Sequence, residues 1–267
     1  ALAFAPGTVS VVTGNPGHGK TTVMMQVWCD LAENFDLVVA VASFETRPKP
    51  HHRRAIRQFY RQALDRSLTE KEKQEADEWN ERHFLWLVHP GHRPTLKWVL
   101  DTAEVAVVRH GAKVLQIDPW NKLEGDKPSE MRETDYIGQC LDEIVVFARD
   151  MNCHVQILAH PAKVDSRNRG RAPYLEDISG SKHWDNKCDL GVVIHRPKIM
   201  VSGERQFGSE VWVRKARYEE LGHPCRLKIA MNPMNGLFET AKDEDEPEEA
   251  AKPKKKAAKT DMFEGQS

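Results

Sequence analysis

The 267-residue sequence has little of what marks membrane-spanning or disulfide-linked proteins. No apolar run approaches the roughly 20 residues of a membrane-spanning helix. Residues 1–6 (ALAFAP) put no charged segment before a long apolar one, which argues against a secretory leader. The cysteines form no C-x-x-C pair, so we expect reduced packing residues and neither a zinc site nor a disulfide framework. They are Cys29, Cys140, Cys153, Cys188 and Cys225.

Charge of one sign does not dominate either. A net charge of −1 excludes a uniformly basic nucleic-acid binder but leaves room for local basic patches. His89 and His92 flank a Pro-Gly turn with no third ligand nearby, which indicates a loop and not a metal site. The composition favours a cytoplasmic protein, and we expect a bacterial or phage-infected cell.

The informative stretch is residues 14–21 (GNPGHGKT), which fit the phosphate-loop pattern G-x-x-x-x-G-K-[ST]. A predicted strand at 8–13 precedes it and a helix begins near residue 22. Such a loop surrounds phosphates with backbone N–H groups, and the helix N-terminus adds partial positive charge. Lys20 would contact the β- and γ-phosphates and Thr21 a Mg²⁺ ion. The predicted nucleotide site is Gly14, Asn15, Pro16, Gly17, His18, Gly19, Lys20, Thr21 and Thr22; a glycine-rich turn that binds nothing is the alternative.

Three further apolar runs of strand length, at 37–44, 113–117 and 155–159, each lead to a polar residue: Glu45, Asp118 and His160. Continuous apolar strands are typical of a parallel sheet covered on both faces. Ligands of such sheets bind beyond the carboxyl ends of the strands. We therefore expect Asp118 to organise Mg²⁺ beside the phosphate loop, whereas His160 either lines the site or is a satisfied structural residue.

The remaining pattern completes an α/β fold. The sequence predicts helices at 52–65, 71–82, 95–110 and 133–150, and an S/T-x-x-E capping box at 67–70. It predicts strands at 84–88 and 190–194 and alternating, antiparallel strands at 210–214 and 226–230. We expect a mainly parallel sheet with helices on both faces in residues 1–240, and antiparallel strands toward the C-terminus. Residues 241–267 read as a disordered charged tail that solubilises the protein or docks on a partner.

Two groups of basic side chains need an explanation. Arg53, Arg57 and Arg61 recur every four residues along one predicted helix, where they face solvent or contact DNA or a neighbouring subunit. Lys163, Arg167, Arg169 and Arg171 follow His160 in a stretch with almost no apolar residues. A basic loop of this kind suits phosphate backbones, although an ordinary solvated loop is the alternative.

Taken together, these motifs resemble the RecA-like ATPase core of the DnaB family of replicative ring helicases, especially the phage primase–helicase and Twinkle-like branch. The resemblance runs from about residue 6 to 239. Residues 14–21 match Walker A, 43–45 (SFE) the second motif, 114–118 Walker B, 158–160 (LAH) the sensor motif, and 177–181 and 214–217 (RKAR) two later motifs. Residues 118–121 (DPWN) fit the Twinkle-like branch better than the bacterial helicases.

The resemblance implies an ATP-dependent DNA helicase domain, with ATP and Mg²⁺ as cofactors and a homo-hexameric ring as its assembly. It implies translocation on single-stranded DNA during replication. Glu45 would activate water, His160 would sense the γ-phosphate, and Lys215 and Arg217 would reach the next subunit's nucleotide. The DNA-binding residues would be Lys163, Arg167, Arg169, Arg171 and Lys182, and the tail could contact other replication proteins.

Two other functions share the same core. One is a RecA-fold recombinase or plasmid-replication ATPase, and the other is a nucleotide-switched loader that does not unwind DNA. The sequence contains no primase, zinc-binding or amino-terminal helical domain. The linker helix that clips subunits together in this family would lie upstream, so we expect weak ring assembly by this chain alone.

Overall fold

The computed structural model describes residues 3–91, 94–123, 125, 127–162, 170–178, 182–197, 200–201, 204–205 and 208–241. The helices are α1 (Lys20–Phe35), α2 (Arg53–Arg61), α3 (Glu70–His83), α4 (Leu96–His110), α5 (Glu133–Asp150) and α6 (His183–Lys187). The strands are β1 (Val9–Thr13), β2 (Val39–Ser43), β3 (Phe84–Trp86), β4 (Val114–Asp118), β5 (His154–Ala159), β6 (Leu190–His195), β7 (Met200–Val201), β8 (Glu204–Arg205), β9 (Gly208–Ala216), β10 (Cys225–Met231) and β11 (Phe238–Thr240). The predicted tail lies outside the described residues, except for Ala241.

The main sheet has nine strands in the order β11-β10-β9-β6-β1-β5-β4-β2-β3. The strands from β6 to β3 pair in parallel, and β9, β10 and β11 extend the sheet antiparallel beyond β6. The predicted fold class is therefore confirmed. Because parallel strands end at one edge, the segments that follow β1, β2, β4, β5 and β6 all leave the sheet on the same side.

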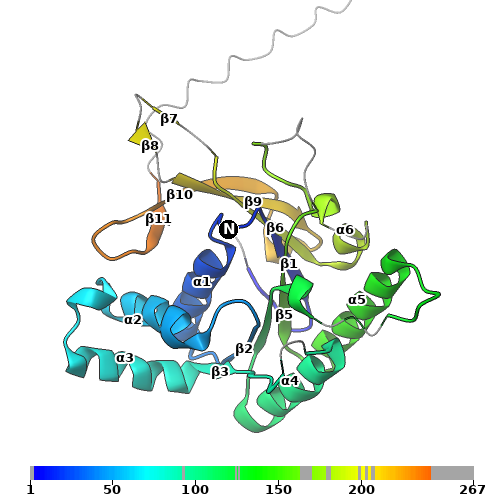
Figure 1. The fold of residues 1–267 in the computed structure, drawn as a ribbon, viewed down its shortest axis with the longest axis horizontal. Coiled ribbons are helices and arrows are strands. Elements are labelled where there is room, and N and C mark those ends of the chain that lie inside the picture. Colours follow the sequence, from blue (N-terminus) through cyan, green and yellow to red (C-terminus); the bar gives the residue numbers. More distant parts are fainter. Residues whose placement is uncertain are drawn as a thin grey trace, which may run out of the picture.

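Helices cover both faces of the sheet (Figure 1). Alternate strand residues point to opposite faces, so neighbouring residues enter different cores. Val11, Ile117 and Ile157 pack with α4, α5 and Trp184 on one face. Val12 and Leu158 pack with α1, Ile56 of α2 and Trp79 of α3 on the other. Four of the five cysteines are buried as predicted, whereas Cys225 on β10 is exposed.

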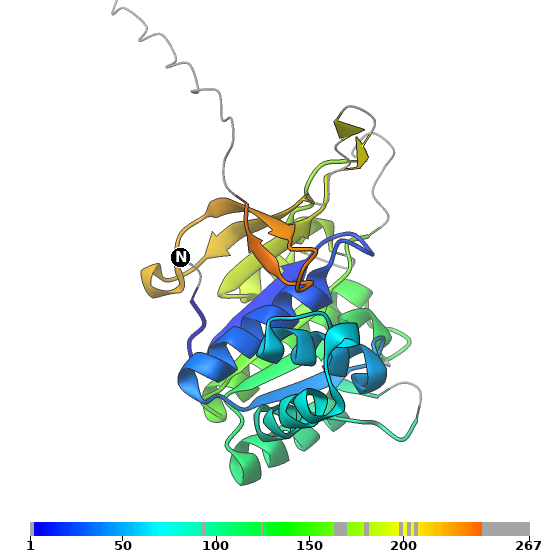
Figure 2. The same cartoon turned by 90° about the vertical axis from the view of Figure 1, so that its left-hand side faces the viewer.

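Strand β11 was not predicted from the sequence, and it packs beside α1 (Figure 2). The side-chain amide of Gln26 donates to the Phe238 carbonyl at 2.7 Å, and its oxygen accepts from the Phe238 N–H at 2.7 Å. This pair of bonds fixes the end of the antiparallel extension against the helix that follows the phosphate loop. No helix in the described part of the chain is long and apolar enough to cross a membrane.

The capping box predicted at 67–70 is wrong by two residues. Helix α3 begins after Thr69, whose hydroxyl accepts from the Glu72 N–H at 3.3 Å, while Glu72 accepts from the Thr69 N–H at 2.9 Å. Ser67 instead donates to the Leu64 carbonyl at 2.6 Å and closes the preceding turn. Both registers carry the S/T-x-x-E spacing, and the turn before α3 selects the second.

The arginines of α2 face α3 and not solvent. Arg53 and Arg57 both bond to Asp77, Arg57 at 2.7 Å, and Arg57 is only 15% exposed. Arg61 bonds to Glu72 at 2.8 Å and to Glu75 at 3.1 Å. The two alternatives drawn from the sequence, a solvated face and a face for DNA or a neighbouring subunit, are therefore both wrong, because ion pairs within the chain occupy these guanidinium groups.

Replacing Asp77 with Asn should lower the free energy of unfolding at neutral pH by about 1–3 kcal/mol, because two partly buried arginines lose a charged acceptor. Burial raises the pKa of Asp77, but the hydrogen bonds from Arg53 and Arg57 outweigh it and hold the pKa well below its ordinary value. A depressed pKa in the folded state stabilises the protein above the unfolded value of about 3.9. Urea unfolding should therefore show the gap between wild type and variant narrowing as the pH falls below about 4.

The exposed pair Lys97–Asp101 on α4 provides a matched control. Asp101→Asn should change the free energy of unfolding by less than about 0.5 kcal/mol. Equal losses in the Asp77 and Asp101 variants would contradict the assignment of the α2–α3 ion pairs as a structural element.

Candidate nucleotide site

The phosphate loop joins β1 to α1, and its glycines adopt backbone conformations that other residues rarely take. The φ angles of Gly14, Gly17 and Gly19 are 153°, 78° and 91°. A Cβ on Gly14 would lie 2.1 Å from the carbonyl oxygen of Ile194 in β6. Gly14 is therefore required for the close approach of the loop to the neighbouring strand.

Helix α1 begins with backbone donors that no side chain caps. Its N-cap is Gly19, which has no side chain, and the first turn carries no acidic residue. Orphan N–H groups at a helix N-terminus form a ready site for an anion. The structure thus brings together all the residues predicted to hold the nucleotide at this joint: Gly14, Asn15, Pro16, Gly17, His18, Gly19, Lys20, Thr21 and Thr22.

Three predicted residues form a hydrogen-bonded chain across the edge of the sheet. Lys20 Nζ donates to Nδ1 of His160 at 3.1 Å and to the Gly14 carbonyl at 2.8 Å. His160 Nε2 lies 3.5 Å from Glu45 Oε2. This geometry fits a neutral His160 with its proton on Nε2. His160 is therefore part of the site and not a structural histidine remote from it.

Asp118 and Thr21 supply oxygen atoms of the kind that bind Mg²⁺. Thr21 makes a side-chain hydrogen bond to the Asp118 carboxylate. Asp118 is 4% exposed, and its Oδ2 atom is buried without a hydrogen-bond partner among the described residues. A buried, unpartnered carboxylate oxygen beside a hydroxyl fits a hard divalent cation.

Burial disfavours the charged forms of the central groups. It lowers the pKa of Lys20 to about 8, although Asp118 and Glu45 partly oppose this effect. It raises the pKa of Asp118 to about 6, against the hydrogen bond from Thr21 and the charge of Lys20. Burial and the nearby Lys20 lower the pKa of His160, while Glu45 raises it. Opposing pKa shifts in one group of neighbours are typical of functional sites.

Asn121, for which the sequence predicted no role, supports His160. The Oδ1 atom of Asn121 accepts from the His160 backbone N–H at 2.9 Å. Asn121 lies in the short helical turn Trp120–Lys122 after β4, beside the end of β5. Its only signal in the sequence is its position three residues after Asp118 at a strand end.

Lys215 and Arg217 lie at the opposite edge of the sheet. Strand β9 runs antiparallel to β6, and Ala216 pairs with Leu190 at the start of β6, whereas the phosphate loop lies at the other end. Arg217 bonds to Asp189 Oδ1 at 2.8 Å and donates to the Asn186 carbonyl at 2.6 Å. Lys215 donates to the Asp185 carbonyl. Neither side chain can reach its own phosphate loop across the length of the strands.

Of the residues predicted to bind DNA, only Arg171 and Lys182 are among the described residues; Lys163, Arg167 and Arg169 lie outside them. Arg171 pairs with Asp177 at 3.1 Å and lies 5.2 Å from the centre of the Tyr174 ring. Lys182 is exposed and immediately precedes α6. Arg171 is therefore engaged within the chain, and Lys182 faces solvent.

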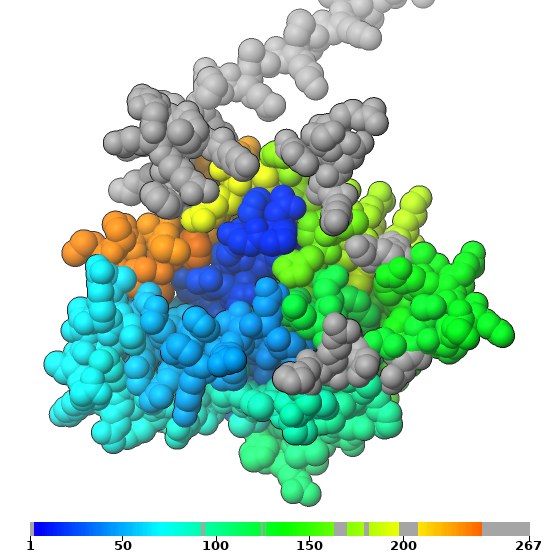
Figure 3. All heavy atoms as spheres, viewed as in Figure 1, coloured from blue at the N-terminus to red at the C-terminus, as the bar shows by residue number. Residues whose placement is uncertain are grey.

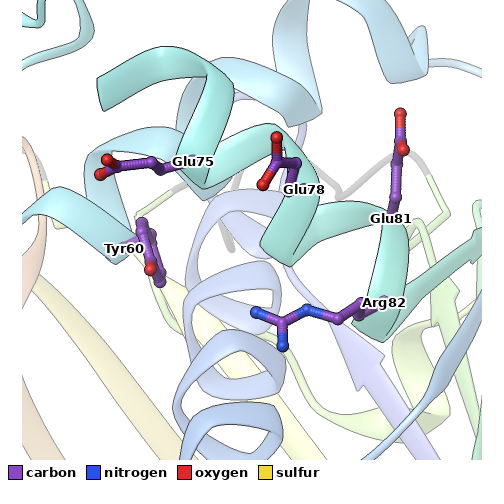
Figure 4. Close-up of a pocket in the computed structure, with 5 residues that line it drawn as sticks. All are labelled: Tyr60, Glu75, Glu78, Glu81 and Arg82. Carbon is purple, nitrogen blue, oxygen red and sulfur yellow. The ribbon is translucent and has the colours of Figure 1, made fainter. Parts of the chain in front are cut away.

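A hollow of about 550 Å³ between α2 and α3 is separate from this site (Figure 4). Tyr60, Glu75, Glu78, Glu81 and Arg82 line it. Three glutamates repel phosphate, so the hollow does not suit a nucleotide. The phosphate loop belongs instead to the blue segment that reaches the surface in the middle of the face in Figure 3, between light-blue and green parts of the chain.

The phosphate loop, the polar strand ends and the mainly parallel sheet define the class: this is a phosphate-loop nucleotide-binding protein with a RecA-like fold. The particular family follows from its sequence. Residues 3–166 match the family described as AAA domain, and the chain belongs to that family.

The Twinkle homolog protein, chloroplastic/mitochondrial, of Arabidopsis thaliana is 33% identical over 229 residues, which are 82% of this chain. They make up 32% of the relative, so the chain spans about a third of that protein's length. The name assigns the relative to organelles, whereas the compartment expected for this chain stays a prediction.

Solved structures give the same fold. A DnaB-like replicative helicase, solved in a study of its interactions with primase, has a TM-score of 0.73 at 17% identity over 88% of this chain and 59% of that one. A separately solved ATPase domain aligns with a TM-score of 0.71 at 16% identity, over 90% of this chain and 86% of that one. The RadB recombinase has a TM-score of 0.61 at 14% identity over 90% and 93%. These low identities establish the fold alone, and with the Arabidopsis relative they confirm the resemblance to the DnaB-type core.

Gly14→Ala should destabilise the protein more than Gly111→Ala, although both glycines have a positive φ. Gly111 ends α4 with open space around it, so alanine there should cost only the backbone strain of about 1–2 kcal/mol. At Gly14 the new Cβ also collides with the Ile194 carbonyl. Thermal unfolding and titration with a fluorescent ATP analogue test this; equal melting temperatures and intact nucleotide binding in both variants would contradict it.

Proposed function

We propose that this chain is the motor core of an ATP-dependent DNA helicase, which hydrolyses ATP at subunit interfaces and translocates on single-stranded DNA during replication. The observation that carries the proposal is the separation of Lys215 and Arg217 from Lys20 by the length of the strands. Cations that serve such a site must come from a second copy of the chain. Repeated head-to-tail contacts of this kind generate a ring or a filament, and a hexameric ring is our proposal.

Within one subunit, the residues at the strand ends would bind Mg·ATP. Lys20 would pair with the β- and γ-phosphates, and Thr21 and Asp118 would hold Mg²⁺. The bound cation would stabilise negative charge on the phosphate oxygens. The unpartnered Oδ2 of Asp118 and the uncapped first turn of α1 support this assignment, because both groups lack the partners that the ligand would supply.

Glu45 would orient the attacking water and accept its proton, and His160 would sense the γ-phosphate. The carboxylate of Glu45 is about half exposed and 3.5 Å from His160, so it can receive a water molecule without losing its orientation. When phosphate takes Lys20, the Nδ1 atom of His160 loses its donor and becomes available to a new one. The state of the nucleotide would thus change the hydrogen bonds at the end of β5.

The trans cations would complete the site. Arginine fingers raise the rate about 10³- to 10⁵-fold in other phosphate-loop enzymes, so isolated subunits should hydrolyse ATP slowly. In the single chain Arg217 bonds to Asp189 and Asn186. Assembly would have to replace these partners with the neighbour's γ-phosphate.

DNA would bind along the basic segment after β5, with Lys163, Arg167, Arg169, Arg171 and Lys182 as phosphate contacts. Changing Arg167 and Arg169 to Ala should abolish the stimulation of ATP hydrolysis by single-stranded DNA. The dependence of DNA affinity on salt should weaken by about 0.7 in log–log slope per lost contact. Arg171→Ala should have a smaller effect, because Asp177 already pairs with Arg171.

The control for that experiment is Arg109→Ala, which removes the same charge from an exposed position on α4. Undiminished stimulation in the Arg167 and Arg169 variant would remove this segment from DNA binding. DNA-stimulated hydrolysis without fork unwinding would indicate a recombinase-like ATPase, and hydrolysis independent of DNA would indicate a nucleotide-switched loader.

A mixing experiment tests the shared site. Lys20→Ala and Arg217→Ala should each hydrolyse ATP poorly alone, because every interface then lacks one partner. In an equal mixture, about a quarter of the head-to-tail interfaces combine an intact phosphate loop with an intact Arg217, so activity should reappear. Measuring ATP hydrolysis against the mixing ratio, with single-stranded DNA present, reads this directly. No recovery at any ratio would exclude Arg217 as a trans-acting residue.

A further inference from the structure

His195 lies where the phosphate loop meets the end of β6. It is the last residue of that strand and is 4% exposed. Its ring packs against the ring of His18 in the phosphate loop, with 5.4 Å between centroids. His18 Nδ1 in turn accepts from the backbone N–H of Arg196 at 3.0 Å. The tip of the phosphate loop is therefore attached to the end of β6 by one ring contact and one hydrogen bond.

The same imidazole is hydrogen-bonded to the backbone of Gly170, and this bond raises its pKa. A bond that favours the protonated ring is one in which the histidine donates, so the acceptor is the Gly170 carbonyl. Burial is the larger effect and lowers the pKa of His195, which favours the neutral ring with a single N–H. The Nδ1 atom is buried without a partner in the described ranges. The one donor of His195 is thus committed to Gly170.

The ring has little freedom to move toward the rest of the sheet. Glu210 of β9 is the cross-strand partner of His195. Its carboxylate already accepts from Trp212 Nε1 at 2.8 Å and from Arg226 at 2.5 Å. A contact held between a packed strand and an occupied carboxylate transmits a displacement of His18 to Gly170 and is not free to absorb it.

The topology makes this contact the second of two. Strand β1 lies between β5 and β6. The segment that carries the predicted DNA-binding residues leaves β5 at His160, which bonds to Lys20, and by Gly170 it has reached His195 at the end of β6. Both ends of that segment are therefore connected to the phosphate loop, on opposite sides of β1.

We propose that His195 is a positioning residue that couples the phosphate loop to residues 163–171 through His18 and Gly170. The coupling itself needs only a nucleotide, whereas its consequence for DNA rests on the function proposed above. A phosphate that reorganises residues 14–21 displaces His18, and the His195–Gly170 bond passes this displacement to the far end of the segment. Binding at the segment changes the phosphate loop by the same amount, because coupling free energies are reciprocal.

Hydrogen exchange on the whole chain tests the coupling without DNA and without turnover. In wild type, a saturating non-hydrolysable ATP analogue with Mg²⁺ should slow exchange at residues 170–173 by at least about threefold. His195→Phe keeps a ring but loses the donor, so the response there should disappear. His195→Gln keeps a donor and should retain part of it. Exchange in α1 should still respond in both variants, which shows that nucleotide binds.

His83→Phe is the matched control, because His83 is a buried histidine whose Nδ1 bonds to a backbone carbonyl, that of Leu37, at 3.1 Å. It should lose a similar amount of stability and keep the full response at 170–173. A wild type with no response there, or an unchanged response in His195→Phe, would overturn the proposal.

ATP hydrolysis supplies the second readout. In His195→Phe the ratio of DNA-stimulated to DNA-free hydrolysis should fall toward one, whereas His83→Phe should keep the wild-type ratio. A wild type without any stimulation by DNA would contradict the proposed helicase function but not the coupling, which the exchange data decide independently.

Discussion

The parallel pairing of β1 with β5 on one side and β6 on the other determines where the functional groups lie. Strands paired in parallel end together, so the phosphate loop, His160 and His195 meet at one edge of the sheet. The Thr13 hydroxyl donates to the Ala159 carbonyl at 2.9 Å and holds the ends of β1 and β5 in register. The position of Lys20 relative to its partners depends on this ladder and not on residues near it in the chain.

The electrostatics of the site follow from the same burial. Lys20 and Asp118 are both largely withdrawn from water, and burial shifts each pKa toward the neutral form. A ligand that brings an anion to the lysine and a cation to the aspartate relieves both costs at once. The structure thus favours a charged pair such as a nucleotide phosphate with a divalent cation, and it explains why opposing groups are kept within one narrow space.

The antiparallel extension serves a different purpose. Strand β9 carries Lys215 and Arg217 away from the phosphate loop to the other end of the sheet, where Asp189 and the end of α6 bind them. The segment between β5 and β6 returns to the phosphate loop at His195. One chain therefore presents a binding site at one edge, a pair of cations at the other, and a basic segment connected to the first.

The sequence by itself determined the fold class and the near side of the site, because buried parallel strands have continuous apolar runs and their polar termini must converge. Gly14, Glu45, Asp118 and His160 were all recognisable in this way. It determined which faces of α2 are charged but not what lies opposite, so the pairing of Arg57 with Asp77 was missed. The support of His160 by Asn121 and the bond from His195 to Gly170 were likewise decided only by tertiary structure. The physical reason is common to these cases: periodicity specifies the direction of a side chain, whereas its partner is selected by packing between segments far apart in the chain.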